Sequence, residues 1–234
     1  MKQHNKVTFA TCYWKGKFRG RENVYTPDWV FRMERMVKRN FSFAKSTRFV
    51  CLTNVDLEPS RPTDTQCETI PLKYSNILKG WWSKMELFRS DLFTPGERVI
   101  YLDLDLVILN DLSPFVSFDA DFGIVKSFGN PNKEKGTVHK YNSSVMVFNA
   151  HSEVVRHLWE HFIVTENVQN DYRGDQDFIG DVVTAKTFPE NWITKLRYLD
   201  DPNKKPKEPK IVLCMPKKNN IAAGRYDWVR EIWK

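Results

Sequence analysis

The apolar residues of this 234-residue chain fall into short runs and helix-spaced stripes that alternate along the sequence. Runs rich in β-branched and aromatic residues predict strands at 7–12, 48–53, 67–72, 99–109, 121–125 and 144–149. Apolar positions at helical spacing predict a helix that begins at Pro27, and others at 81–88, 154–162 and 174–183. The resulting β-α-β-β-α-β order is typical of an α/β fold, a sheet with helices on its faces.

Two carboxylates interrupt the most apolar of these runs, at 99–109. Side chains alternate along a strand, so Asp103 and Asp105 are expected on the same side, about 7 Å apart. Buried carboxylates on one side repel each other unless a cation lies between them. Oxygen ligands of this kind suit Mg²⁺ or Mn²⁺, which complete their shell with water and substrate phosphates. The alternative is a pair of aspartates on a solvated strand end.

The first strand also ends in a loop with candidate chemistry. In α/β sheets, ligands bind at the carboxyl ends of the strands. The segment Thr11-Cys12-Tyr13-Trp14 and the Asp103–Asp105 pair both follow apolar strand residues. The sequence therefore predicts that they share one site.

Composition and charge limit the number of domains and the classes of protein that the chain can belong to. The chain is long enough for one large domain, and its 41% hydrophobic content supports a sizeable core. The formal charge of +7 is spread along the sequence without a zinc-finger or RNA-recognition signature, so no nucleic-acid partner is expected. The four cysteines form no C-x-x-C pair, which disfavours a zinc site or a disulfide framework.

The charged, proline-rich segment 201–210 is expected to be an exposed loop.

The sequence shows no signal for secretion or membrane insertion. The first residues lack the apolar core of a signal peptide, and no apolar run approaches the roughly 20 residues of a membrane span. We therefore expect a soluble, cytoplasmic protein with no transmembrane segment.

Several motifs together resemble a known family. In chain order they are Thr11-Cys12-Tyr13, Lys84, Tyr101-Leu102-Asp103-Leu104-Asp105, Asn110-Asp111-Leu112, Asn142-Ser143-Ser144-Val145-Met146-Val147-Phe148-Asn149 and Gly174-Asp175-Gln176. This ordered set resembles the nucleotide-sugar-dependent glycosyltransferases of the GT-A fold, most closely the glycogenin-like family eight. The resemblance implies a single GT-A-type domain over 1–234, with a mixed, mostly parallel sheet flanked by helices. A nucleotide-binding half at 1–110 and an acceptor and sugar half at 111–234 are expected.

The resemblance implies how the donor is held. The Asp-x-Asp motif, Asp103-Leu104-Asp105, would hold Mn²⁺ or Mg²⁺ against the diphosphate, with Asp105 as the more direct ligand and Asp103 shared with the ribose. Thr11, Cys12 and Tyr13 would cradle the nucleobase. The alternative for Tyr13 and its neighbour Trp14 is that they cap the sheet.

It also implies residues around the donor sugar. Asn142 and Ser143 would contact sugar hydroxyls. Lys84, Asp175 and Gln176 are the expected catalytic residues. Asp175 would orient hydroxyls, stabilise an oxocarbenium-like transition state or act as nucleophile, a choice that the residues leave open.

Ordinary structural roles stand beside these catalytic ones. Lys84 fits a solvated helix lysine, and Asp175 fits a carboxylate favoured by a helix N-terminus. Trp81 and Trp82 fit either an acceptor groove or packing.

One departure from the family concerns a third metal ligand. The family usually carries a histidine in a His-x-Gly-x-x-Lys-like segment near its C-terminus. The equivalent stretch here is 211–218, where Cys214 or Met215 takes the approximate place of the histidine. A thioether is a poor ligand for Mg²⁺ or Mn²⁺. Lys217, beside Lys218, is still expected to contact the diphosphate.

These observations favour a metal-dependent glycosyltransferase that moves a hexose from a nucleoside diphosphate sugar, with UDP expected, to a saccharide, lipid or protein acceptor. The resemblance favours retention of the anomeric configuration. One alternative is a catalytically weakened sugar-nucleotide-binding protein of the same fold. Another is a sugar nucleotidyltransferase, although the loop at 15–20 only loosely approximates the glycine-rich loop of those enzymes.

Overall fold

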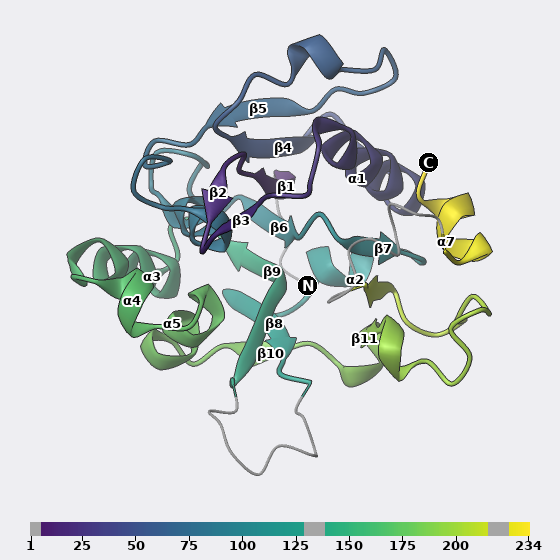
Figure 1. Cartoon of the computed structure of the whole chain (residues 1–234). Helices are drawn as coiled ribbons and strands as arrows, with labels where there is room; N and C mark the ends of the chain where they lie inside the picture. Colours follow the sequence, from purple (N-terminus) through teal and green to yellow (C-terminus); the bar gives the residue numbers. More distant parts are fainter. Residues whose placement is uncertain (1–5, 129–138, 215–224) are drawn as a thin grey trace.

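The computed structural model describes residues 6–128, 139–214 and 225–234. Its central sheet has the strand order β10-β8-β9-β6-β1-β4-β5 (Figure 1). The strands are β1 (Val7–Tyr13), β4 (Thr47–Thr53), β5 (Glu68–Pro71), β6 (Arg98–Leu102), β8 (Phe122–Lys126), β9 (Tyr141–Asn149) and β10 (Lys186–Thr187). Strand β9 runs antiparallel to β6 and β8, and the other neighbouring pairs are parallel. The expected mixed, mostly parallel sheet is confirmed.

Helices cover both faces of this sheet (Figure 1). Along β1, Phe9 and Tyr13 pack in one core cluster with α1 (Pro27–Asn40), whereas Ala10 belongs to the other. That second cluster includes residues of η2 (Gly80–Phe88), α3 (Glu153–Val164) and α5 (Asp175–Val182). The element η2, predicted as a helix, has 3-10 geometry. The alternation of side chains along a buried strand thus divides the core into two layers.

Shorter elements complete the chain. They are α2 (Ser113–Val116), α4 (Val168–Asp171), α7 (Asp227–Ile232), η1 (Glu58–Ser60), η3 (Glu190–Trp192), η4 (Leu196–Tyr198) and the hairpin strands β2 (Lys17–Phe18) and β3 (Arg21–Glu22). Over the parts of the chain described above, no helix combines the length and the apolar character needed to cross a membrane.

The predicted strand at 99–109 is wrong in one respect, because it is two strands. β6 ends at Leu102, and β7 (Leu106–Ile108) pairs with β12 (Ile211–Leu213) in a second sheet with β11 (Ile193–Lys195). The Asp103–Asp105 segment is the turn where the chain passes from one sheet to the other. Asp103 and Asp105 are therefore not strand residues, and the prediction that strand alternation places both on the same side is wrong.

The central sheet also joins the two expected halves of the chain. β9, which lies after residue 110, pairs with β6 from Arg98↔Asn149 to Leu102↔Val145. The start of β9 thus lies beside the carboxyl end of β6, where Asp103 follows.

Buried Glu97 ties together the opposite, amino-terminal edge of the sheet. Its carboxylate accepts hydrogen bonds from Thr8 and Thr94 and lies 3.1 Å from Arg48. Burial opposes the charge of Glu97, but these partners outweigh it and lower its pKa to about 2. Glu97 is 1% exposed, so this network holds an ionised carboxylate inside the protein.

We expect Glu97→Gln to destabilise the protein at pH 6 by about 3 kcal/mol, because the lowered pKa of Glu97 makes its ionised form stabilising. That stability is present above the unfolded-state pKa of about 4.5 and is lost as pH falls towards about 2. Urea unfolding of both proteins at pH 6 and pH 3 measures the difference, which should shrink at pH 3. Glu153→Gln, at an exposed position in α3, is the control. A Glu97→Gln deficit that is independent of pH would contradict this assignment.

Candidate active site

Four elements bring polar side chains together at the carboxyl edge of the sheet. Asp103 directly follows β6, and Ser143 lies in the first part of β9 beside it. Lys84 comes from η2 and Asp175 is the first residue of α5. The backbone N–H of Asp103 donates to the Ser144 carbonyl at 2.9 Å, which fixes the turn against β9.

The ammonium of Lys84 is at the centre of this group. It donates hydrogen bonds to Asp103 Oδ1 at 3.0 Å and to Ser143 Oγ at 3.3 Å. It also lies 3.5 Å from Asp175 Oδ2. Lys84 is only 5% exposed, so it is not the solvated helix lysine of the alternative reading. We call Lys84, Asp103, Ser143 and Asp175 the Lys84 cluster.

Charges within the cluster counteract the effect of burial. Burial alone would lower the pKa of Lys84, but the charges of Asp103 and Asp175 outweigh it and raise that pKa. Burial and, to a smaller extent, repulsion by Asp103 raise the pKa of Asp175, against the effects of Lys84 and Ser143. Lys84 is therefore firmly cationic, and it holds together two carboxylates that would otherwise repel each other.

Tyrosines that the sequence did not indicate support both aspartates. The Tyr101 hydroxyl donates to Asp103 Oδ1 at 2.6 Å, and its ring lies 5.3 Å from the Lys84 ammonium. Tyr25, just before α1, is hydrogen-bonded to Asp105. Burial, then the charges of Asp105 and Asp103, raise the pKa of Tyr25 well above its ordinary value. Both phenols are therefore neutral donors.

Asp105 faces a different neighbourhood from Asp103. It is 1% exposed, and its backbone carbonyl accepts a hydrogen bond from the Cys214 N–H at 3.2 Å. Cys214 is the residue directly after β12, in the segment where the family resemblance places a histidine. Burial, with a contribution from Asp105, raises the pKa of Cys214. A sulfur ligand suits Mg²⁺ or Mn²⁺ less well than the histidine of the family does. Met215, Lys217 and Lys218 lie outside the described residues.

The donor atoms of Asp103 and Asp105 fit a hard divalent cation. Both supply carboxylate oxygens, which Mg²⁺ and Mn²⁺ prefer. In 6–128, 139–214 and 225–234, no group of three His, Cys, Asp or Glu side chains is arranged to hold a metal ion. A cation held by two aspartates would therefore take its other ligands from water and phosphate oxygens.

Thr11, Cys12 and Tyr13 lie within β1, which ends at Tyr13, and not in a loop after the first strand as predicted. Thr11, Tyr13 and Trp14 are at most 6% exposed, and Tyr13 and Trp14 pack in the two core clusters. This is the packing that was the alternative to base stacking. Cys12 is partly exposed and lies within electrostatic reach of Lys84 and Asp103, while burial raises its pKa.

The remaining predicted residues differ in surroundings. Leu104 is 2% exposed and belongs to the core. Asn142 accepts a hydrogen bond from the Ser144 N–H at 3.2 Å. Gln176 is half-buried beside Asp175 in α5. The nucleobase and sugar contacts of these residues remain predictions.

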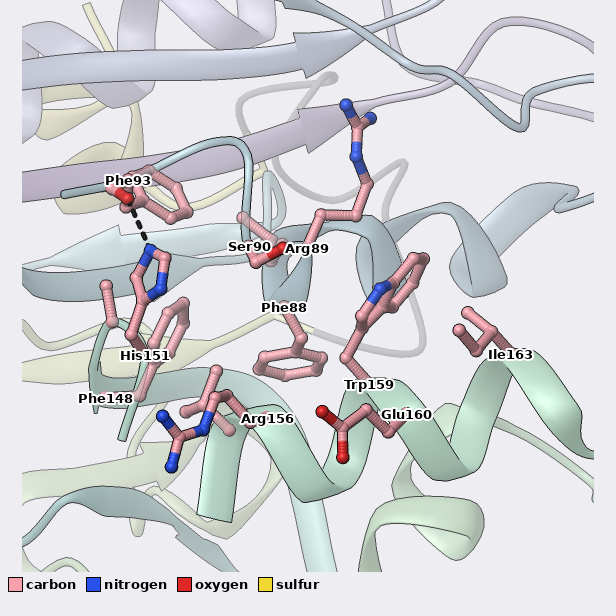
Figure 2. A pocket seen from close by; sticks show the side chains of 13 residues that line it. Phe88, Arg89, Ser90, Phe93, Phe148, His151, Arg156, Trp159, Glu160 and Ile163 are labelled. Atoms are coloured by element: carbon pink, nitrogen blue, oxygen red, sulfur yellow. Dashed lines mark hydrogen bonds between the residues drawn. The ribbon is translucent and has the colours of Figure 1, made fainter. Parts of the chain in front are cut away.

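A cavity of about 350 Å³ lies elsewhere (Figure 2). Phe148, Ala150 and His151 line it at the end of β9, whereas Ser143 lies near the start of that strand. His151 is hydrogen-bonded to the Phe93 carbonyl at 2.8 Å, as Figure 2 shows. None of the predicted site residues lines this cavity, so we do not assign the candidate chemistry to it.

No family model matches the sequence, and no curated protein matches it. Solved structures do match the fold. The galactosyltransferase LgtC, solved with donor and acceptor sugar analogues, gives a TM-score of 0.65 at 12% identity, over 97% of this chain and 95% of LgtC.

Two further structures show the same likeness. The glycosyltransferase GlyE of Streptococcus pneumoniae matches with a TM-score of 0.57 at 16% identity, over 91% of this chain and 55% of GlyE. Mouse xyloside xylosyltransferase 1 matches with a TM-score of 0.53 at 15% identity, over 91% of this chain and 99% of the enzyme. This chain therefore has a fold shared with glycosyltransferases, as the GT-A resemblance predicted. Membership of the glycogenin-like family remains a prediction.

We expect Lys84→Met to destabilise the protein by about 3 kcal/mol at pH 7.5, because it leaves Asp103 and Asp175 buried without their cation. The loss should be smaller at pH 5 than at pH 7.5, because the variant lacks the Lys84 charge that lowers the pKa of Asp175, and the buried carboxyl then takes up a proton more readily as pH falls. Denaturant unfolding at the two pH values measures both effects. Lys45→Met, at an exposed position, is the control. A loss equal to that of the control would show that the cluster is unimportant for folding.

Proposed function

We propose that this protein is a metal-dependent glycosyltransferase that transfers a hexose from a nucleoside diphosphate sugar, with UDP as the expected nucleotide. The observation that carries the proposal is the buried Lys84 cluster, which joins Asp103 after β6 to Asp175 at the start of α5. It lies at the carboxyl edge of a sheet, the usual ligand-binding edge of α/β folds, in a fold shared with glycosyltransferases.

Charge balance favours a metal in the proposed site. With Asp103, Asp105 and Asp175 ionised, three negative charges face the single positive charge of Lys84 among the groups described above. A diphosphate would add further negative charge, and repulsion would oppose its binding unless a cation came with it. Asp103 and Asp105 would hold Mn²⁺ or Mg²⁺, which would neutralise charge on the leaving nucleoside diphosphate.

The chain's own residues have distinct proposed roles. Tyr101 and Lys84 fix the carboxylate of Asp103, and Tyr25 supports Asp105. Glycosyl transfer develops positive charge at the anomeric carbon, which a nearby carboxylate stabilises. Asp175 is our candidate for that carboxylate, and Ser143 and Asn142 for contacts with sugar hydroxyls.

Gln176 and Leu104 have proposed roles close to these. Gln176 would help Asp175 to orient the sugar, and the Leu104 backbone would approach the nucleotide. We extend the proposal to retention of configuration, which the resemblance to family eight implies.

A panel of sugar nucleotides with Mn²⁺ tests the proposal. We expect slow release of the nucleoside diphosphate from one donor, reduced at least about 100-fold in Asp105→Asn, because the metal contribution is worth several kcal/mol. Asp64→Asn, which removes a surface carboxylate paired with Arg35, is the matched control and should keep wild-type turnover.

Three results would contradict the proposal. Turnover in Asp105→Asn that equals the turnover of wild type would exclude a metal-binding role for that residue. Donor binding without turnover, for all donors and acceptors tried, would favour a sugar-nucleotide-binding protein. Pyrophosphate release from a nucleoside triphosphate and a sugar phosphate would favour a nucleotidyltransferase.

A further inference from the structure

An exposed tryptophan lies next to the Lys84 cluster. Trp81 is 41% exposed, whereas its neighbour Trp82 is fully buried, so the two adjacent rings have different roles. A Cβ atom placed on Gly174 would lie 3.4 Å from the Trp81 indole nitrogen. Gly174 directly precedes Asp175. The pyrrole edge of Trp81 therefore lies at the start of α5, next to the residue that precedes Asp175.

Residues of the β2–β3 hairpin contact this ring. The Phe18 ring meets Trp81 edge-on at 4.8 Å, and the Arg19 guanidinium lies 5.1 Å from the centre of the Trp81 ring. Arg19 also donates to the carbonyls of Gln169 and Arg173, each at 3.4 Å. We call Phe18, Arg19 and Trp81 the aromatic platform. Its contacts fix the ring from two segments far apart in the sequence.

The exposed part of Trp81 combines apolar and polar character. Among the described residues, its indole N–H has no hydrogen-bond partner. The Arg19 guanidinium, 5.1 Å from the centre of the ring, adds N–H donors beside it. A flat apolar face with donors at its rim complements a sugar, whose C–H faces are apolar and whose edge carries hydroxyls.

We propose that the aromatic platform is the acceptor subsite and that it binds a saccharide, with Trp81 as the residue that selects it. This inference rests on the proposed transferase function and narrows the acceptor from saccharide, lipid or protein to a saccharide. A sugar ring packed on Trp81 would place a hydroxyl close to Asp175, where the donor sugar is expected. Arg19 is a positioning residue that holds the Trp81 ring.

The test compares wild type with Trp81→Ala, Trp81→Phe and a control. Phe43→Ala is the control, because Phe43, like Trp81, contacts an aromatic ring, here Phe9, and a cation, here Lys38, although it is half-buried. It lies in the loop before β4, at the amino-terminal edge of the sheet. Thermal unfolding of each variant checks that the fold is intact.

The probes are cellobiose, maltose and lactose, with an octyl alcohol and a serine peptide as the lipid-like and protein-like alternatives. Saturation-transfer NMR, with and without UDP and Mn²⁺, measures binding of each probe. We expect at least one disaccharide to bind, about tenfold more weakly in Trp81→Ala and about threefold more weakly in Trp81→Phe, which keeps a ring but loses the N–H. The control should match wild type.

Two results would overturn the inference. Disaccharide binding that is as tight in Trp81→Ala as in wild type would show that the ring is not the subsite. Binding of the octyl alcohol or the peptide, with no binding of any disaccharide, would show that the acceptor class is wrong.

The donor-turnover assay, together with calorimetry of UDP with Mn²⁺, distinguishes this failure from that of the proposed function. If the transferase proposal fails, wild type releases no nucleoside diphosphate from any sugar nucleotide, whether or not it binds UDP and whatever the disaccharides do. If only the subsite inference fails, UDP binds wild type and Trp81→Ala with similar affinity while the disaccharide measurements give one of the contrary results.

Discussion

A buried ammonium held between two carboxylates is the interaction on which the candidate site depends. Lys84 reaches Asp103 at 3.0 Å and Asp175 at 3.5 Å, and these contacts join η2, the turn after β6 and the start of α5. Without that charge, the two carboxylates would repel each other in a poorly solvated interior, and the three elements would separate at the edge where a ligand is expected. The same ion pairing leaves the described site with an excess of negative charge, which is why a diphosphate donor would need a cation.

The break between β6 and β7 gives the two aspartates different surroundings. Asp103 is directed to Lys84, in the layer of the protein formed by η2, α3 and α5. Asp105 meets Tyr25, just before α1, and Cys214, just after β12. Two acidic residues that are separated by one leucine thus have different hydrogen-bond partners, although the charges of both act on Tyr25. The aromatic platform adds a third component, since the β2–β3 hairpin brings Phe18 and Arg19 to Trp81 beside Asp175.

Much of the fold could be predicted because its signals are local. The β-branched run at 7–12 and the helical stripe after Pro27 became β1 and α1 almost as expected. The resemblance carried by an ordered set of motifs implied that Lys84, Asp103 and Asp175 belong to one site, but it did not imply that Lys84 pairs directly with both carboxylates. The break at Asp103–Asp105 could not be read from an apolar run, because β7 leaves the sheet to pair with β12, more than a hundred residues later. Tyr25 was missed, and Tyr101 was named in a motif without a role, for a similar reason, since a tyrosine in a strand or a loop carries no signal of the carboxylate that folding brings to its hydroxyl.

The most direct test of the account is where a manganese ion binds. Mn²⁺ is paramagnetic, and it broadens NMR signals of methyl groups near it. With Mn²⁺ and UDP added to methyl-labelled protein, the signals of Leu104 and Val145, beside the Asp103 turn, should broaden strongly. Those of Val7 and Val155, near the opposite edge of the sheet, should stay sharp. Broadening of Val7 or Val155 in place of Leu104 and Val145, or no broadening at all, would contradict a metal and diphosphate site built around Asp103, Asp105 and Lys84.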